Sequence, residues 1–532
     1  SAEYGGGLLI EYCDSMSLSG VIASGCSADF DGGAIYTADS HSMSLSGVTA
    51  SGCSAEYGGG LLIEYCDSMS LSDMTVSDCS SSVNGGAIYV GESHYMSLSG
   101  VTASGSSADY GGGFFITFCE SMVVSNITMS DCYGTEGGGC YITQSDSMSL
   151  SNITASGCSA SYGGGCYITS SDSISLSGVT ASDCTADEEG GGLTITHMSS
   201  MSVSDITVSD CSANLGFGGG LYGYILDSVS LSGVTATGCS AEYGGGGGIY
   251  AGSSMIISNI TTAGCSAGSG GGGFMIEESD SISLAGVTAS GCTAGSNGGG
   301  FRIENSNTIS LSGVTASGCS ANSKGGGYYI TGSDSISLAG VIASGCSASS
   351  NGGGFHITDS DSLFLSNITT SDCSADVDGG GGYISSSDSI SLAGVTASGC
   401  SASSNGGGFH ITDSDSIFLS NITTSDCSAD VDGGGFYIYS SDSISLSGVT
   451  ASGCSASSNG GGVYASNDDN LSLFNYTAND CSAGVDGGFA YFDSYNTDLS
   501  LVGVSVSNCW AISHGGGIFM NQDNSNAQLV GL

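Results

Sequence analysis

Apolar and polar residues alternate along this chain in short stretches that recur from one end to the other. Within residues 406–432, Phe409 and Ile411 alternate with polar neighbours, and Ile417 and Leu419 do the same further along. A period of two residues is typical of β-strands that turn one face inward. No stretch shows the i, i+3, i+4 spacing of an amphipathic helix. The pattern predicts three short strands per stretch, separated by Gly, Asp-Ser and Ser-Asp corners.

The stretch is a repeat. Glycine triplets or their equivalents recur about every 27 residues, which gives about twenty copies and is typical of a solenoid. Residues 347–400 and 401–454 are almost identical, so two copies form a super-repeat of about 54 residues. We therefore predict an all-β fold, a right-handed parallel β-helix of about 20 coils of about 27 residues, with the hand that crossover connections prefer. Because each coil packs only on its neighbours, we expect one continuous β-helix over 1–532, with divergent coils at 479–532.

The composition of the chain limits the classes of molecule that it is expected to bind. The 532 residues include 93 Gly and no Pro, and 50 acidic residues face only two Lys and Arg, for a net charge of -48. Such a surface repels nucleic acid and anionic membranes, so neither is an expected partner. No apolar stretch is long enough for a membrane-spanning helix, and no signal peptide is recognisable. Disorder is disfavoured because the apolar residues keep their phase in every copy.

One column of the repeat holds cysteine in nearly every coil. Residues in register on neighbouring coils lie about 4.8 Å apart, whereas a disulfide needs Cβ atoms about 3.8 Å apart. We therefore expect mostly buried free thiols, which pack as small apolar groups. Cys140 and Cys166 occupy neighbouring first strands and are the better disulfide candidates.

A second column alternates between glycine and asparagine, and each asparagine begins an N-x-Thr sequon. Two interpretations stay open: N-glycosylation, or asparagine replacing glycine at a corner that needs a left-handed backbone. We favour glycosylation. A further sequon, N-L-S, lies in another column. The candidates are Asn126, Asn152, Asn259, Asn367, Asn421, Asn475 and Asn470.

A third column is acidic. Like charges about 5 Å apart repel by on the order of 1 kcal/mol in water, so the column needs compensation. Bound Ca²⁺, which takes carboxylate and carbonyl oxygens, is one interpretation; carboxylates fanned into water and screened by salt are the other. The candidate ligands are Asp334, Asp361, Asp388, Asp415, Asp442 and Asp469. Ca²⁺ is the only cofactor that the sequence suggests.

A fourth column is aromatic, and its period predicts that it points outward from the strands. Stacked rings at a surface could bind sugars or a neighbouring fibre; they could equally be a ladder that stabilises the sheet, which we favour. The column comprises Tyr329, His356, Tyr383, His410, Tyr437 and Tyr464.

Catalytic motifs are not recognisable. The six histidines are scattered and fit neither a Ser/His/Asp nor an HExxH pattern. Carboxylate pairs occur everywhere and so identify nothing. We therefore expect that the chain is not an enzyme.

Two short motifs carry a resemblance to a known family. Residues 32–35 and 85–88 read GGAI, and residues 364–367 and 418–421 read FLSN, which fits FxxN. These tetrapeptides resemble the repeats of the chlamydial polymorphic membrane proteins, surface adhesins with a β-helical passenger. The resemblance implies a β-helix and an exterior location.

Together these features predict an extracellular structural protein, a glycosylated β-helical rod. Neither end shows a polar cap, so we expect copies to stack head to tail into a fibre or surface appendage. Two alternatives stay open: a cell-surface adhesin that binds glycans or receptors, and a polysaccharide-processing β-helix enzyme. Expected partners are the chain itself, N-linked glycans and extracellular polysaccharide, at an extracellular or cell-surface location.

Overall fold

Residues 2–521 and 524–531 are described by the computed structural model. They fall into two compact units, Ser1–Ser266 (unit 1) and Ala267–Leu532 (unit 2). All regular elements among these residues are β-strands. The prediction of a single uninterrupted β-helix over 1–532 stays a prediction.

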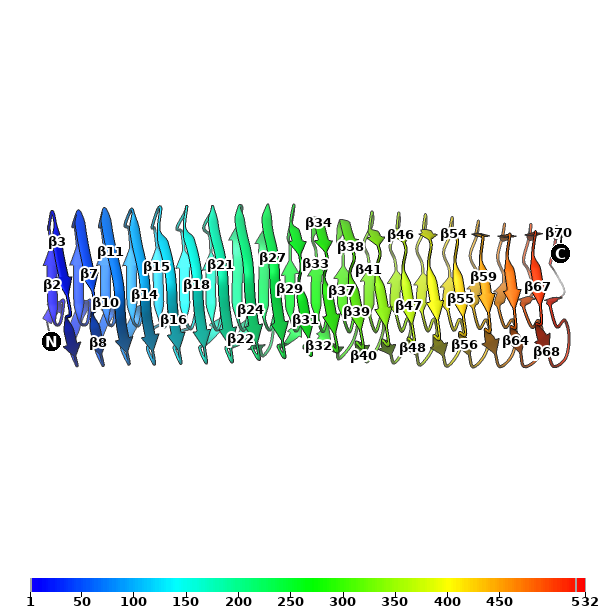
Figure 1. Ribbon diagram of the computed structural model, residues 1–532, viewed down its shortest axis with the longest axis horizontal. Helices are drawn as coiled ribbons and strands as arrows, with labels where there is room; N and C mark the ends of the chain where they lie inside the picture. Colours follow the sequence, from blue (N-terminus) through cyan, green and yellow to red (C-terminus); the bar gives the residue numbers. More distant parts are fainter. Residues whose placement is uncertain (1, 522–523, 532) are drawn as a thin grey trace. The chain divides into compact units, whose positions relative to one another are not determined.

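A coil of unit 1 consists of three strands, β17 (Cys140–Thr143), β18 (Ser149–Ser156) and β19 (Ser159–Tyr162). Each strand pairs in parallel with the same strand of the next coil; Ile142, for example, lies opposite Ile168. Figure 1 shows these strands side by side, coil after coil. The prediction of a parallel β-helix is confirmed.

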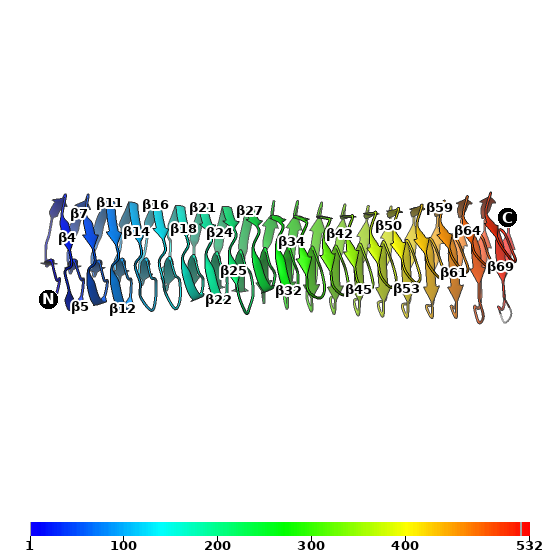
Figure 2. The same ribbon diagram turned by 90° about the horizontal axis from the view of Figure 1, so that it is seen from below.

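A coil of unit 2 has shorter strands, β45 (Phe355–Thr358), β46 (Phe364–Ser366), β47 (Thr369–Ser371) and β48 (Ser374–Ala375). The middle stretch, one long strand in β18, is divided here at a corner occupied by Asn367. Figure 2 shows the short strands of unit 2 and the loops that follow them. The predicted period of two residues and the corners are therefore observed in both units.

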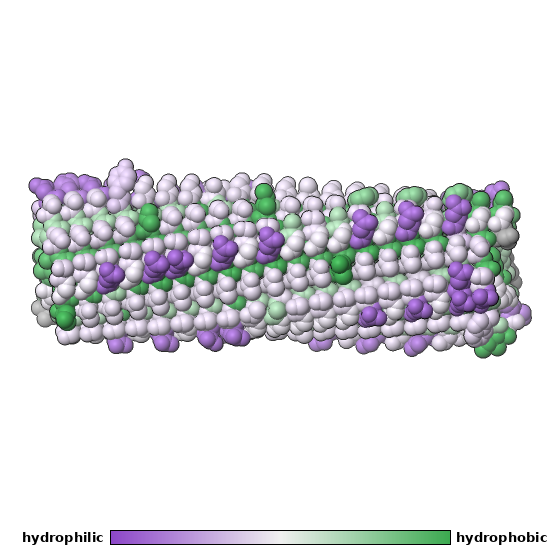
Figure 3. Space-filling model, viewed as in Figure 1, coloured by the Kyte–Doolittle hydropathy of each residue, from purple (hydrophilic) through white to green (hydrophobic). Residues whose placement is uncertain are grey.

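The core of each unit is a column of inward-facing aliphatic and cysteine side chains. Ile142, Leu150 and Cys158 are buried in unit 1, and Leu365 and Cys373 are buried in unit 2. Figure 3 shows one face of the surface, on which rows of small polar side chains are interrupted by strongly hydrophilic residues. The alternation read from the sequence thus separates a dry interior from a hydroxyl-rich exterior.

The second glycine of each triplet is required by a close backbone contact. A Cβ atom at Gly112 would lie 2.1 Å from the carbonyl oxygen of Tyr133, and one at Gly353 would lie 2.4 Å from that of Ser374. No side chain fits at such distances. The glycine therefore allows the backbone before the first strand to lie directly against the backbone that follows the column cysteine of the next coil.

Candidate functional site

An aromatic groove lies on the surface of unit 1. Its floor is a stack of rings from the first strands of three successive coils, β13 (Ile88–Gly91), β15 (Phe114–Thr117) and β17. The ring centroids of Tyr89 and Phe115 are 5.3 Å apart, and those of Phe115 and Tyr141 are 5.4 Å apart. The rings stack because parallel pairing places these residues opposite one another. Stacked in this way, they present their edges and phenol groups outward.

Two exposed rings flank this floor. Tyr110, which is 38% exposed, precedes the glycine triplet, and its ring centroid lies 5.8 Å from that of Tyr141. Phe118, which is 52% exposed, follows β15 in a left-handed conformation with φ of 49°. Between them the groove has a volume of about 480 Å³. The remaining lining is polar and uncharged, comprising Asn84, Thr117, Thr143, Gln144 and Ser170.

The phenol groups of Tyr89 and Tyr141 in the groove stay protonated at neutral pH. Burial, followed by the nearby carboxylates Glu64 and Glu92, raises the pKa of Tyr89, and burial followed by Glu136 raises that of Tyr141. Burial also raises the pKa of Glu136 itself. The groove thus offers neutral hydrogen-bond donors and acceptors beside apolar rings, in an acidic neighbourhood.

The predicted aromatic column lies in unit 2, where it is stacked but covered. Consecutive rings stack with centroids 4.8 Å apart for His356 and Tyr383 and 4.6 Å apart for His410 and Tyr437. His356 is only 1% exposed and His410 6%; Tyr329 and Tyr464 are buried as well, whereas Tyr383 and Tyr437 are half-buried. The column therefore does not form the open surface that the period suggested. The rings do point away from the core, but they stack on one another, and corner side chains such as Asp378 lie beside them.

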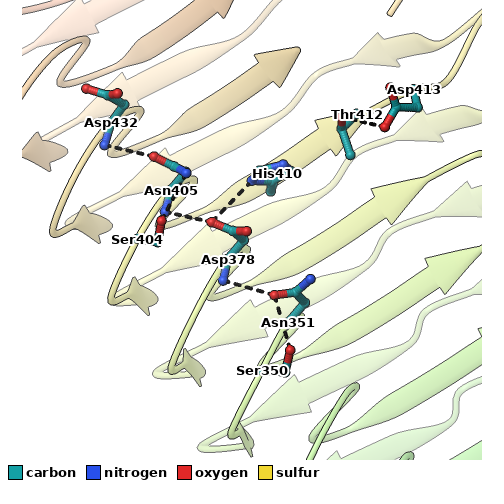
Figure 4. Close-up of polar contacts among 9 residues, drawn as sticks. All are labelled: Ser350, Asn351, Asp378, Ser404, Asn405, His410, Thr412, Asp413 and Asp432. Atoms are coloured by element: carbon teal, nitrogen blue, oxygen red, sulfur yellow. Dashed lines mark hydrogen bonds and ion pairs between the residues drawn. The ribbon is translucent and has the colours of Figure 1, made fainter. Parts of the chain in front are cut away.

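A ladder of amide and carboxylate side chains links the successive corner loops beside these rings. The backbone N–H of Asn405 donates to Oδ1 of Asp378 at 2.9 Å, and that of Asp432 donates to Oδ1 of Asn405 at 3.3 Å. Oδ1 of Asp378 also lies 3.7 Å from Nδ1 of His410. Figure 4 shows the ladder running beside His410 from one loop to the next. The loops are thereby fixed to each other beside His410.

The acidic column is compensated by the backbone. Oδ1 of Asp361 accepts the N–H of Asp388 at 2.8 Å, and Oδ1 of Asp388 accepts the N–H of Asp415 at 2.8 Å. The same bond recurs along the exposed column of Asp334, Asp361, Asp388, Asp415, Asp442 and Asp469. These bonds offset part of the repulsion between neighbouring carboxylates. A calcium site at this column stays a prediction.

The sequon asparagines lie at exposed corners. Asn126, Asn152, Asn259, Asn367, Asn421 and Asn475 all have φ between 50° and 53°. Asn470, in its separate column, is exposed with φ of 55°. Both interpretations of the sequence require such a corner, so glycosylation stays a prediction at this point.

The cysteines are free thiols in the structure. Cys140 and Cys166 lie in register on β17 and β20 (Cys166–Thr169), as expected, and the disulfide between them stays a prediction. Burial raises the pKa of Cys119 to about 11, so this thiol is protonated at neutral pH. The thiols thus behave as core side chains.

The described residues, 2–521 and 524–531, contain no group of three or more His, Cys, Asp or Glu side chains placed to hold a metal ion. Over the same residues, no helix has the length and apolar character needed to cross a membrane.

The sequence matches the model of a known family over residues 59–224 and 286–450, more than half of its length. The family is described as the right-handed β-helix region. This chain belongs to the right-handed β-helix family. The match covers coils of both units and confirms the predicted fold; the closer resemblance to chlamydial membrane proteins stays a prediction. No curated protein matches the sequence.

Solved structures with similar folds come from several kinds of protein. The A-module of the mannuronan C-5 epimerase AlgE6 from Azotobacter vinelandii is 13% identical, with a TM-score of 0.31 over 79% of this chain and 91% of that one. PfbA, a surface adhesin of Streptococcus pneumoniae, is 10% identical, with a TM-score of 0.30 over 70% and 84%. The PL6 family alginate lyase AlyGC is 9% identical, with a TM-score of 0.22 over 87% and 97%. At these values the likeness concerns the fold alone.

The comparison corrects one expectation, that the chain is not an enzyme. Chains that share the β-helix fold include epimerases and a lyase that act on a polysaccharide. Because this fold builds sites from columns of residues on separate coils, a missing linear motif is not a reason to exclude catalysis.

The groove was missed in the sequence because its signal is spread over several coils. Two of the three groove coils have only four residues before the glycine triplet, at 107–110 and 133–136, whereas the third, at 80–84, has five, as do the corners of unit 2 at 347–351 and 374–378. The signal in the sequence is therefore the aromatic residues in register at 89, 115 and 141, together with the aromatic residues at 110 and 118.

Proposed function

We propose that unit 1 binds a neutral oligosaccharide or polysaccharide in the aromatic groove. The chain then functions as an extracellular or cell-surface β-helix that recognises carbohydrate, the adhesin alternative of the sequence analysis. The observation that carries this proposal is the open groove between the exposed rings of Tyr110 and Phe118.

The chemistry of the lining fits a sugar. Aromatic rings pack against the C–H groups of a sugar, and a few well-placed polar groups fix its orientation. Here Tyr110 and Phe118 supply apolar surface on two sides, while Asn84, Gln144 and Thr143 supply amide and hydroxyl groups. Binding between two rings buries more of a sugar than a single exposed ring could.

Charge favours a neutral ligand. Only two Lys and Arg are present in the whole chain, and both, Arg302 and Lys324, lie in unit 2. The carboxylates Glu64, Glu92 and Glu136 act on the phenols of the groove. A uronate polymer would meet this acidic neighbourhood without a cation to pair with.

The test is a binding screen against neutral polysaccharides and their oligosaccharides, with affinities measured by calorimetry. Phe118→Ser and Tyr110→Asn are well-matched variants, because Ser170 holds the position of Phe118 two coils along the column and Asn84 holds that of Tyr110 in the adjacent coil. Each is expected to weaken binding about tenfold, as for an aromatic hot spot. The control is Tyr133→Ser, which removes an exposed ring outside the groove at a position held by Ser107 and Ser159 in the adjacent coils.

Two results would overturn the proposal. One is that no neutral saccharide binds; the other is that the Phe118 and Tyr110 variants bind as tightly as the control. The same incubations are analysed for released products, and release that Phe118→Ser abolishes would extend the proposal from binding to polysaccharide processing. Head-to-tail assembly into a fibre stays a prediction.

A further inference from the structure

We infer that Asn367, Asn421 and Asn475 of unit 2 carry N-linked glycans, and that the exposed phenylalanine beside each one packs against the first sugar. This inference concerns a different column from the aromatic groove and stands on separate observations.

The first observation is the backbone at each site. Asn367, Asn421 and Asn475 are exposed at corners with φ of 51°, 52° and 50°. The side chain at such a corner is exposed, with its Oδ1 beside the glycine of the next coil, and the threonine two residues later lies on the outer face of the next strand. Each site therefore accommodates a glycan without disturbing the ladder of backbone hydrogen bonds.

The second observation is an exposed aromatic ring at each of these corners. Phe364 and Phe418 stand three residues before Asn367 and Asn421 and are 49% and 48% exposed, and Phe474, directly before Asn475, is 44% exposed. In the coils whose corner residue is glycine, the position of Phe364 is held by Ser337 and Ser391.

This association recurs at two of the three sequons of unit 1, whereas the third, Asn152, has Ser149 three residues before it. In unit 1, Val123 precedes Asn126 by three residues and is 50% exposed, and Ile256 precedes Asn259 by three residues and is 61% exposed. Their neighbours in register are again serines, Ser97 and Ser230. An apolar side chain left in water costs free energy, and a sugar face packed on it would recover part of that cost.

The third observation is the spacing. Gly394 separates Asn367 from Asn421 along the column, so the two asparagines are two coils, or about 9.6 Å, apart. A Cβ atom at Gly394 would lie 3.0 Å from Oδ1 of Asn367. Alternation with glycine thus leaves room for one glycan on every second coil.

Asn126 and Asn152 are an exception to this spacing of two coils, and they give a further expectation. They lie on adjacent coils, and Nδ2 of Asn152 donates to Oδ1 of Asn126 at 3.1 Å. Two glycans cannot stand at that spacing of about 4.8 Å. One molecule is therefore expected to carry a glycan at only one of the two.

The modification is a group transfer from a polyprenyl diphosphate-linked oligosaccharide. The amide Nδ2 of asparagine attacks C1 of the first sugar and loses one proton to solvent. The C1–N bond forms while the C1–O bond to the diphosphate breaks, and the lipid diphosphate leaves with the bonding electrons. The remaining Nδ2–H stays available as a hydrogen-bond donor.

The experiment is secretion of the full chain from a eukaryotic host, followed by enzymatic removal of glycans in heavy-oxygen water and peptide mass spectrometry. Glycans are expected at Asn367, Asn421 and Asn475. Asn367→Gly should remove only the first, and the fold should be preserved because glycine occupies this position in the adjacent coils at Gly340 and Gly394. Bare asparagines at all three sites, in cells that glycosylate a co-expressed reporter, would overturn the inference.

Phe364→Ser tests the role of the ring. It should speed amidase release of the glycan at Asn367 from the folded protein by at least about twofold, a factor consistent with one aromatic packing contact. Release at Asn421 in the same molecule is the internal control and should not change. Equal rates at Asn367 before and after the substitution would contradict the packing of the ring on the sugar.

Discussion

The first-strand rings are buried to a similar degree in the two units, but the corners beside them differ. In unit 1, Phe115 is 6% exposed, and the exposed rings of Tyr110 and Phe118 stand beside it in an open groove. In unit 2, His410 is likewise 6% exposed, but Asn and Asp side chains such as Asp378 stand beside it and form a ladder. In this fold, the corner residues decide whether exposed rings flank the column of first-strand rings.

The largest expected loss of stability follows substitution of the second glycine of the triplet, which both units share. Gly112→Ala in unit 1 and Gly353→Ala in unit 2 each force a Cβ atom against a carbonyl oxygen, at 2.1 Å and 2.4 Å. Each should lower the free energy of unfolding by several kcal/mol, on the order of the most damaging core substitutions. Thermal unfolding measures this. A small effect in one unit alone would show that the backbone contact is not common to both.

The next effect concerns a carboxyl group buried in unit 2. Asp468 is fully buried, its Oδ1 accepts the N–H of Ser441 at 2.9 Å, and its Oδ2 has no partner. Burial raises its pKa to about 8. Since this is above the pKa in the unfolded chain, the folded state holds the proton more tightly, and stability should fall as the pH rises from about 4 to about 8.

Asp468→Asn should remove that pH dependence and stabilise the protein at pH 8 by a few kcal/mol. An amide fits this position, because Asn496 holds it in the next coil and donates from Nδ2 to the carbonyl of Asp493 at 3.0 Å. Unfolding midpoints between pH 4 and pH 9 measure the effect. Parallel curves for the variant and the parent chain would contradict it.

The buried histidines predict that stability falls as the pH is lowered, which is opposite in direction to the effect of Asp468. Burial, followed by the charge of Lys324, lowers the pKa of His356 to about 3, and burial lowers that of His410 while Asp378 opposes the shift. The unfolded chain therefore binds more protons as the pH falls below about 6.5, and stability should decrease toward pH 4 by on the order of 1.4 kcal/mol per pKa unit.

The double variant His356→Tyr, His410→Tyr should lose most of this acid sensitivity. Tyrosine fits the column, since Tyr329 and Tyr383 hold the same position in register. Unfolding midpoints at pH 4 and pH 7 are compared with those of His41→Ser, a change at an exposed histidine of unit 1. An undiminished loss at pH 4 in the double variant would show that the buried histidines are not its source.

The smallest expected effect tests the ladder of Asn and Asp side chains that links the corner loops of unit 2. Asp378→Ala removes the acceptor of the Asn405 N–H and should cost about 1 kcal/mol. It should also expose His410 to modification by diethyl pyrocarbonate. Asp376→Ala, at an exposed carboxylate of the same loop, is the matched control. Equal modification of His410 in the two variants would show that the ladder does not hold the loop closed.

The fold was predictable because its signal repeats. Alternating residues such as Phe409 and Ile411, with a glycine triplet in each coil, specify strands and corners many times over. The exposed Asn367 corner was predictable for the same reason, since its left-handed backbone is one that glycine and asparagine share. The sequence did not show that His410 is buried, because a period of two residues places it outside the core but does not report the neighbouring rings and the corner side chain Asp378 that lie against it.

Radical footprinting of the folded protein tests the central claim most directly, because it reports the exposure of the flanking rings and of the first-strand column in one experiment. Tyr110 and Phe118 should be oxidised rapidly, and Tyr464 and His356 slowly. A neutral oligosaccharide found in the binding screen should protect Tyr110 and Phe118 and leave Tyr133 unchanged. Equal oxidation of Tyr110 and Tyr464, or protection of Tyr133 in place of Phe118, would contradict the account.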